Sequence, residues 1–383
     1  MGEAGVFSTR SVCHVGISGQ PRDVTVALVG GGTGSHTGRL DQVSRNCIIS
    51  INGLYLTRKY AALTPIANRI IDWILAKIVR TLLLGSIEWT DEIVSLTGSD
   101  FTYNYKELPT RCSDSEIQNY ISRTRDLFNP IARVFEDANN TEWFIRSYLA
   151  LKYVLGSTVL ANSAEYAEER NLQVTLPYLR YYTILNCSRA FLLTLPCLDW
   201  RGEKTIEMTH SNILNLTGDK LKRLGQRHED TVKPRLLAAK DQRELFSYRF
   251  PSTALRIFGD DIVSVEEAID IARLLTDLAQ INLACLESRV NRYHPQRKFG
   301  LLDIDDMWHT MQYDGVTASL IDDEDYSRVA YFVRKYTGPA SLGALATDGL
   351  VDEFFSAWSP VDDIDHQVAF NADRQWNLLL DVW

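Results

Sequence analysis

The sequence predicts a mainly α fold, a multi-helix bundle joined to a small β-containing segment at its N-terminus. Apolar residues recur at helical spacing over most of residues 61–298, and an Asn-Gly pair separates two β-prone runs near residue 52. The composition is that of a globular protein, with 45% hydrophobic and 23% charged residues among 383, which excludes a wholly disordered or collagen-like chain. We therefore divide the chain into an N-terminal segment, 1–60, a helical bundle, 61–298, and an acidic C-terminal region, 299–383.

The N-terminal segment carries the β-prone sequence. Val24 to Val29 predicts a short strand that leads into a glycine-rich loop. Cys47 to Ile51 and Leu54 to Lys59 flank Asn52-Gly53, a pair that is typical of a tight β-hairpin turn in this position. We expect these two runs to pair as strands.

The first helical stretches follow this segment. Thr64-Pro65 predicts a helix start, because proline is favoured at the first helical position, and an apolar face continues from there to Leu82. Residues 116–128 and 131–138 predict two further helical pieces on either side of Pro130, since a proline interrupts the hydrogen-bond ladder of a helix.

Three longer helices are predicted for the centre of the bundle. Residues 142–169 form one helical stretch with an expected break near Gly156, and residues 177–195 form a strongly apolar helix. Ser264 and Glu267 fit a capping box for the third helix, which ends before Pro295. Beyond residue 300 the helical pattern weakens, and Asp-rich loops alternate with short apolar pieces.

The net charge of −9 is unevenly distributed along the chain. Residues 301–383 hold 16 acidic and 4 basic residues, which leaves 33 acidic and 36 basic residues in the first 300. An acidic region of this kind repels nucleic acid. Any nucleic-acid surface is therefore expected before residue 300.

A polar face on the apolar helix 177–195 is one candidate site. Tyr182, Asn186 and Arg189 recur at i, i+4 and i+7, so they share one side of the helix. An amide and a guanidinium within an apolar helix are costly unless they have partners. We expect the three side chains to face a common interior or groove, either as a polar site or as a structural hydrogen-bond network.

His210 lies where the sequence predicts the start of the next helix. Thr209 or Ser211 can cap that helix with a side-chain oxygen. The positive end of the helix dipole disfavours an imidazolium, so a neutral His210 is expected there.

Arg223 and His228 form a second candidate pair, which would lie on nearly the same side if their segment were helical. A histidine that transfers protons and an arginine that stabilises the phosphorane charge can cleave RNA without a metal ion. A solvated charged face is the other explanation of the same residues. Residues 218–250 contain nine basic and only five acidic residues. The basic ones are Lys220, Lys222, Arg223, Arg227, Lys233, Arg235, Lys240, Arg243 and Arg249.

The glycine-rich loop offers a third candidate. Backbone N–H groups near Gly32 and Gly34 could hold a phosphate at a helix start, which would make the protein a nucleotide-binding one. The spacing differs from the dinucleotide fingerprint, and no lysine follows as it does in a P-loop. A flexible turn or linker is the alternative.

We predict no cofactor and no metal site. The six cysteines lack zinc-finger spacing, and the aspartate clusters of the acidic region do not match a calcium-binding loop. Scattered cysteines and an N-terminus without the profile of a signal peptide favour a cytoplasmic setting. No membrane span is expected, because no uncharged apolar run is long enough.

Residues 181–222 resemble the helical YaaC-like proteins of the HEPN-like group. The resemblance rests on polar and aromatic residues at the end of an apolar helix and beyond it, namely Tyr181, Tyr182, Asn186, Arg189, Pro196, Trp200, Thr209, His210 and Ser211. It implies a helical bundle that often forms homodimers. For active members it implies a metal-independent ribonuclease of a toxin–antitoxin or antiphage system, with an arginine followed a few residues later by a histidine. Arg223 and His228 match that spacing, although Leu224 stands where the group usually has a polar residue.

These features leave three functions open. The first is a cytoplasmic HEPN-like protein that binds or cleaves RNA, with His228 or His210 as the acid/base and Arg223 or Arg189 as the phosphate stabiliser. The second is a non-enzymatic helical interaction or assembly subunit with a protein partner, and the third is the nucleotide-binding protein. Convergence of the two arginines and the two histidines would favour the first function, and scatter would favour the second.

Overall fold

The structure is a computed structural model of the chain, which forms two compact units, Met1–Leu84 and Gly85–Trp383. In the first unit it describes three strands. In the second it describes residue 103 and the ranges 105–198, 208–301, 323–359 and 370–381. Asn52 and Gly53, the glycine-rich loop and the helix expected at 64–82 lie outside the described residues.

The described part of the first unit is a three-stranded antiparallel sheet. Its strands are β1 (Val24–Gly30), β2 (Arg45–Ile51) and β3 (Leu54–Tyr60), in the order β1-β2-β3. The register pairs Val24 with Ile51 between β1 and β2, and Ile51 with Leu54 between β2 and β3. The strands are rich in β-branched residues, which favour extended backbone.

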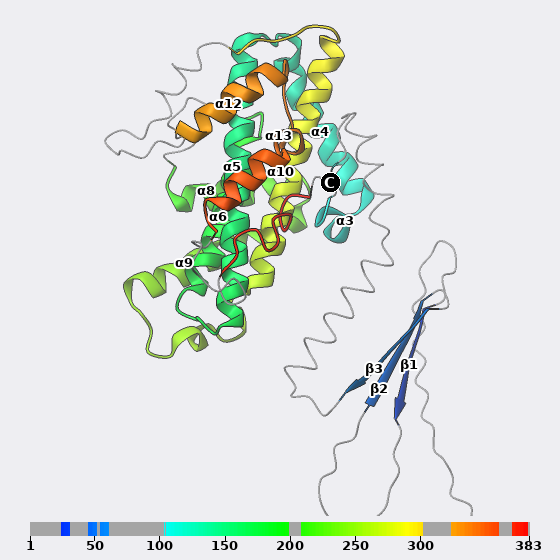
Figure 1. The fold of residues 1–383 in the computed structure, drawn as a ribbon, viewed down its shortest axis with the longest axis vertical. Coiled ribbons are helices and arrows are strands. Elements are labelled where there is room, and N and C mark those ends of the chain that lie inside the picture. Colours follow the sequence, from blue (N-terminus) through cyan, green and yellow to red (C-terminus); the bar gives the residue numbers. More distant parts are fainter. Residues whose placement is uncertain are drawn as a thin grey trace, which may run out of the picture. The chain divides into compact units, whose positions relative to one another are not determined.

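The second unit is built from helices, and the prediction of a mainly α, multi-helix bundle is confirmed (Figure 1). None of the helices within the described ranges is long and apolar enough to cross a lipid bilayer. The elements are α3 (Leu108–Arg111), α4 (Asp114–Arg133), α5 (Asp137–Glu169), α6 (Leu176–Leu193), α8 (His210–Leu221), α9 (Gln226–Tyr248), the 3₁₀-helix η1 (Ala254–Asp261), α10 (Val265–Tyr293), α12 (Asp323–Lys335), α13 (Leu342–Leu345) and α14 (Asp348–Ser356).

Thr209 caps α8 as expected, and the capping box expected for α10 is half formed, because the Glu267 carboxylate binds Arg235 instead; two expected interruptions are wrong. The Ser264 side chain accepts from the Glu267 N–H at the start of α10. Pro130 lies inside α4, so the helix continues past it although the ring removes one N–H donor. α5 continues through Gly156, because burial along most of its length outweighs the roughly 1 kcal/mol that a glycine costs a helix.

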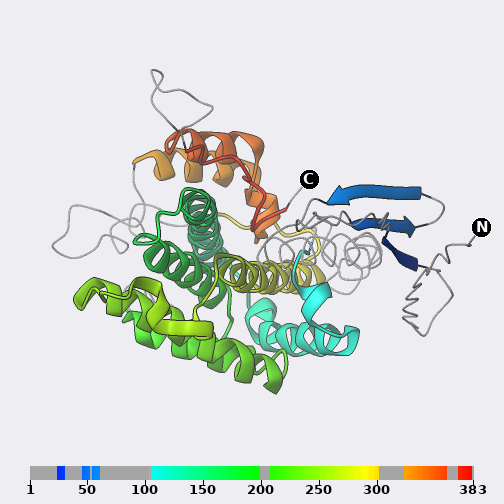
Figure 2. The same cartoon turned by 90° about the horizontal axis from the view of Figure 1, so that it is seen from below.

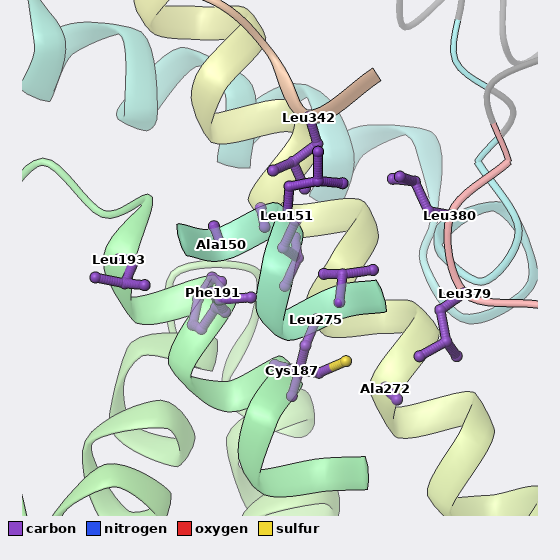
Figure 3. Packing of buried hydrophobic residues seen from close by; sticks show 14 of the residues in the cluster. Ala150, Leu151, Cys187, Phe191, Leu193, Ala272, Leu275, Leu342, Leu379 and Leu380 are labelled. Atoms are coloured by element: carbon purple, nitrogen blue, oxygen red, sulfur yellow. The ribbon is translucent and has the colours of Figure 1, made fainter. Parts of the chain in front are cut away.

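The core lies where α5, α6 and α10 meet. α10 runs between the α5–α6 pair and α4 (Figure 2). Leu151 of α5, Phe191 of α6 and Leu275 of α10 are at most 1% exposed and point into the same interior (Figure 3). Burying a side chain of this size stabilises the fold by about 1.5–3 kcal/mol.

The described parts of the acidic C-terminal region belong to this same core. Leu342 and Leu379 are fully buried beside residues of α5 and α10 (Figure 3). The Asn162 amide donates to the carbonyl of Ala372 over 2.9 Å, and Arg273 donates to the carbonyl of Leu378 over 2.9 Å. These segments therefore complete the bundle.

Candidate functional site

Three residues of α6 at i, i+4 and i+7 form the first candidate site. Tyr182, Asn186 and Arg189 are all half-buried on this one helix. The guanidinium carbon of Arg189 lies 5.5 Å from the ring centre of Tyr153, which comes from the neighbouring α5. The Nε of Arg189 is buried and has no hydrogen-bond partner within the described part of the chain. Such a group is costly to leave unpaired.

His210 meets this face from the start of α8. Thr209 is the N-cap, and its side chain accepts from the Asn212 N–H over 3.3 Å. His210 is the first residue of the helix, with its ring centre 5.8 Å from that of Tyr181 and 6.1 Å from that of Tyr182.

The imidazole of His210 is held in its neutral form. Burial lowers its pKa first, and the positive charges of Arg189 and Arg243 lower it further. Lys240 acts in the same direction, while Glu244 opposes the shift. Since the Lys240 ammonium forms an ion pair with Glu244 over 3.2 Å, this carboxylate is itself engaged.

α9 contributes a second arginine. The Nη2 of Arg243 donates to the Tyr182 hydroxyl over 3.1 Å, and its guanidinium carbon lies 5.5 Å from the ring centre of Tyr181 and 5.8 Å from that of Tyr182. Burial opposes its charge, but hydrogen bonds with Tyr182 and Tyr248 outweigh this and raise the pKa of Arg243. The Nε of Arg243, like that of Arg189, is buried without a partner among the described residues.

Tyr181 lies beneath these groups. Its side chain is 1% exposed, and its hydroxyl has no hydrogen-bond partner in the described ranges. Burial raises the pKa of this phenol, so it stays protonated. We call Tyr181, Tyr182, Arg189, His210 and Arg243 the arginine–histidine cluster. Two permanent positive charges beside a neutral imidazole make it suited to an anion such as a phosphate.

Arg223 and His228 do not share a helix face, because their segment is not one continuous helix. α8 ends at Leu221 and α9 begins at Gln226, so a turn separates the two residues. A Cβ at Gly225, inside this turn, would lie 3.0 Å from Glu116 Oε1, which explains why the smallest residue stands there. The Nη2 of Arg223 donates to the Cys197 sulfur over 3.1 Å.

His228 lies in a separate, structural network. It is 4% exposed, with Nε2 3.4 Å from Glu116 Oε1 and 3.8 Å from the Cys112 sulfur. Arg227 holds the same Glu116 carboxylate over 2.7 and 2.5 Å, and these hydrogen bonds lower the pKa of Glu116 to about 2. Burial lowers the pKa of His228.

The contact between Cys112 and His228 does not make a nucleophile. A catalytic cysteine needs a lowered pKa, whereas burial and the Glu116 charge raise the pKa of the Cys112 thiol to about 12. These residues could not be paired from the sequence, because Cys112 lies between α3 and α4 and His228 follows 116 positions later, in α9.

The candidate residues therefore do not form a single site. Arg189 and His210 come together, with Asn186 on the same face of α6. Arg223 and His228 have their contacts elsewhere, at Cys197 and at Glu116. Arg243 was recognisable in the sequence only as one of nine basic residues between 218 and 250, because its contacts with α6 are tertiary.

The part of the chain that the structure describes contains no group of three or more His, Cys, Asp or Glu residues placed to hold a metal ion. Among the aspartate clusters, Asp325 is buried and accepts from the Tyr148 hydroxyl over 2.6 Å, which fastens α12 to α5. The clusters near 303 and 363, and the loop with Gly32 and Gly34, lie outside the described residues.

Comparison with protein-family models, curated proteins and solved structures gives no match for this chain. The functional argument consequently depends on the residues themselves. The HEPN-like resemblance of residues 181–222 stays a prediction.

Proposed function

We propose that this protein binds RNA through the arginine–histidine cluster and cleaves it without a metal ion, as the HEPN-like resemblance implies. One observation carries the proposal. Arg189 and Arg243, from two different helices, bring two positive charges close enough to His210 to lower its pKa, and Arg243 also contacts the rings of Tyr181 and Tyr182. A phosphodiester would supply the opposite charge.

The chemistry follows from these groups. Neutral His210 takes the proton of a ribose 2′-hydroxyl while the 2′-oxygen forms a bond to phosphorus. Arg189 and Arg243 stabilise the negative charge that develops on the phosphoryl oxygens. The bond from phosphorus to the 5′-oxygen breaks, this oxygen takes a proton from water, and the products are a 2′,3′-cyclic phosphate and a 5′-hydroxyl. The Tyr181 ring, whose centre lies 5.8 Å from that of His210, acts as a positioning residue.

The proposal also covers the location, the oligomeric state and the biological setting of the protein. We place the protein in the cytoplasm, with its β-containing N-terminal segment as a separate piece and a homodimer as its assembly. A toxin–antitoxin or antiphage system would be its setting.

A non-enzymatic interaction subunit is the second candidate function. It is favoured by the positions of Arg223 and His228, whose contacts lie outside the arginine–histidine cluster. RNA cleavage distinguishes the two functions, because only the first predicts it.

Binding of a fluorescent single-stranded RNA to the Arg189→Ala/Arg243→Ala double variant tests the proposal. The proposal expects wild-type binding that weakens at high salt and is lost in the double variant. Lys220→Ala/Lys222→Ala removes the same charge from α8 and the residue that follows it, and should leave most of the affinity. Equal losses in the two double variants would show non-specific attraction and would refute a defined site.

A further inference from the structure

The C-terminal end of α9 carries exposed aromatic side chains next to the arginine–histidine cluster. Tyr248 is 77% exposed and Phe250 is 67% exposed, which is unusual for rings of this size. The end of α9 and η1 lie at the periphery of the helical unit (Figures 1 and 2). No residue of η1 is buried.

The backbone at this end is strained. Phe250 has a φ of +41° and Ala254 a φ of +50°, values that favour glycine. The N–H groups of Arg249 and Phe250 both donate to the carbonyl of Leu245, over 2.9 and 3.1 Å, and this closes α9 while holding Phe250 in place. A bulky residue kept in a conformation suited to glycine is a reason to look for a role of its side chain.

The Phe250 ring is supported on one side by another aromatic ring. It packs edge-on against the buried Phe246 at 6.1 Å between ring centres, and Phe246 also stacks with Phe258 at 6.4 Å. A ring that is supported on one side and exposed on the other loses little freedom when a second flat group stacks on it.

Tyr248 connects this surface to the cluster. It lies five residues after Arg243 on α9 and helps to raise the pKa of that guanidinium, which also contacts Tyr181 and Tyr182. Arg249 and Arg256 are exposed on the same stretch, and Asp260 and Asp261 are exposed at the other end of η1. Aromatic rings between arginines suit a strand that has both bases and phosphates.

We propose that Tyr248 and Phe250 form a stacking surface for the bases of single-stranded RNA, next to the phosphate held at Arg243. This inference rests on the proposed function and narrows it to single strands, because the bases of a duplex are already stacked on one another. A protein partner on the same rings is the competing occupant.

Equilibrium binding to a single-stranded RNA and to a duplex of equal length tests the inference, with wild-type, Tyr248→Ala and Phe250→Gly proteins. Tyr331→Ala removes a similarly exposed ring from α12 and serves as the control. Each test variant should weaken single-strand binding about tenfold. Duplex binding should not change, and neither should the salt dependence, because no charge is removed.

Phe250→Gly should not lower the melting temperature, because glycine relieves the strain of the positive φ and this offsets the lost contact with Phe246. An effect of this variant on RNA binding is therefore not due to unfolding. Unchanged single-strand affinity in both variants, with the loss in Arg189→Ala/Arg243→Ala intact, would overturn the stacking surface alone. Equal losses for single strand and duplex would also overturn it. A wild-type protein that binds no RNA would overturn the proposed function and this inference together.

Discussion

Arg243 of α9 donates a hydrogen bond to the hydroxyl of Tyr182 on α6, over 3.1 Å. The two residues are 61 positions apart, and their contact brings a permanent positive charge to the polar face that already holds Arg189. His210 packs against the Tyr182 ring from a third helix. The site is thus assembled by the packing of α6, α8 and α9.

Removing this guanidinium should weaken anion binding. Arg243→Ala deletes a charged group that would donate to phosphate, and we expect RNA affinity to fall at least tenfold, which corresponds to about 1.4 kcal/mol or more. Arg243→Lys should recover only part of the loss, because an ammonium lacks the planar fork. Fluorescence anisotropy at fixed salt measures both, and Lys222→Ala is the control for charge. Full affinity in Arg243→Ala would place the phosphate elsewhere.

Asp277 of α10 should make stability depend on pH. It is fully buried, accepts from the N–H groups of Glu107 and Leu108 over 2.8 and 3.1 Å, and burial raises its pKa to about 7. The folded form therefore keeps a proton between about pH 4 and pH 7 that the unfolded form loses, so this group's contribution falls as pH rises through that window.

Asp277→Asn removes this titration. Relative to wild type, the variant should gain stability from pH 5 to pH 8, by several kcal/mol at most. Urea unfolding of both proteins at pH 5 and at pH 8 measures the difference in their free energies of unfolding. A constant difference would mean that Asp277 is already ionised at pH 5 in the folded protein.

Arg146 of α5 should be essential for the fold. It is 2% exposed and donates to the carbonyls of Leu193 and Leu195, both over 2.7 Å, at the end of α6. Arg146→Met leaves these carbonyls without their donors, and we expect a loss of about 3–5 kcal/mol in the free energy of unfolding. Arg170→Ala, at an exposed position, should cost under about 0.5 kcal/mol. Similar losses in both variants would contradict this role.

His228 should stabilise the protein without taking part in catalysis. His228→Ala removes a buried ring beside Glu116 and Cys112, so the melting temperature should fall. The folded fraction should retain RNA cleavage, because the arginine–histidine cluster is intact. Thermal unfolding and cleavage per folded molecule separate the two effects, and a loss of cleavage at unchanged stability would assign the acid/base role to His228.

Helical periodicity made the bundle predictable, and the sequence also identified the face of Tyr182, Asn186 and Arg189, because both properties are local. The role of Arg243 was not predictable, since any of nine neighbouring basic residues could have filled it. The burial of His228 against Glu116 was not predictable either, because it depends on the contact between residues of α4 and α9. The helices after residue 323 were not predicted, because they are short and their apolar periodicity is weak. Leu342, from one of them, is nevertheless buried in the core.

Under the proposed function, His210 is the proton-transferring group of a metal-independent ribonuclease, and Arg189 and Arg243 lower its pKa. The most direct test is cleavage of a labelled single-stranded RNA in EDTA by wild-type, His210→Ala and His228→Ala proteins at equal folded concentration. We predict 2′,3′-cyclic phosphate products from wild type and His228→Ala, and a loss of about 10²-fold or more in His210→Ala. Cleavage that persists in His210→Ala, or that EDTA abolishes in wild type, would contradict the claim.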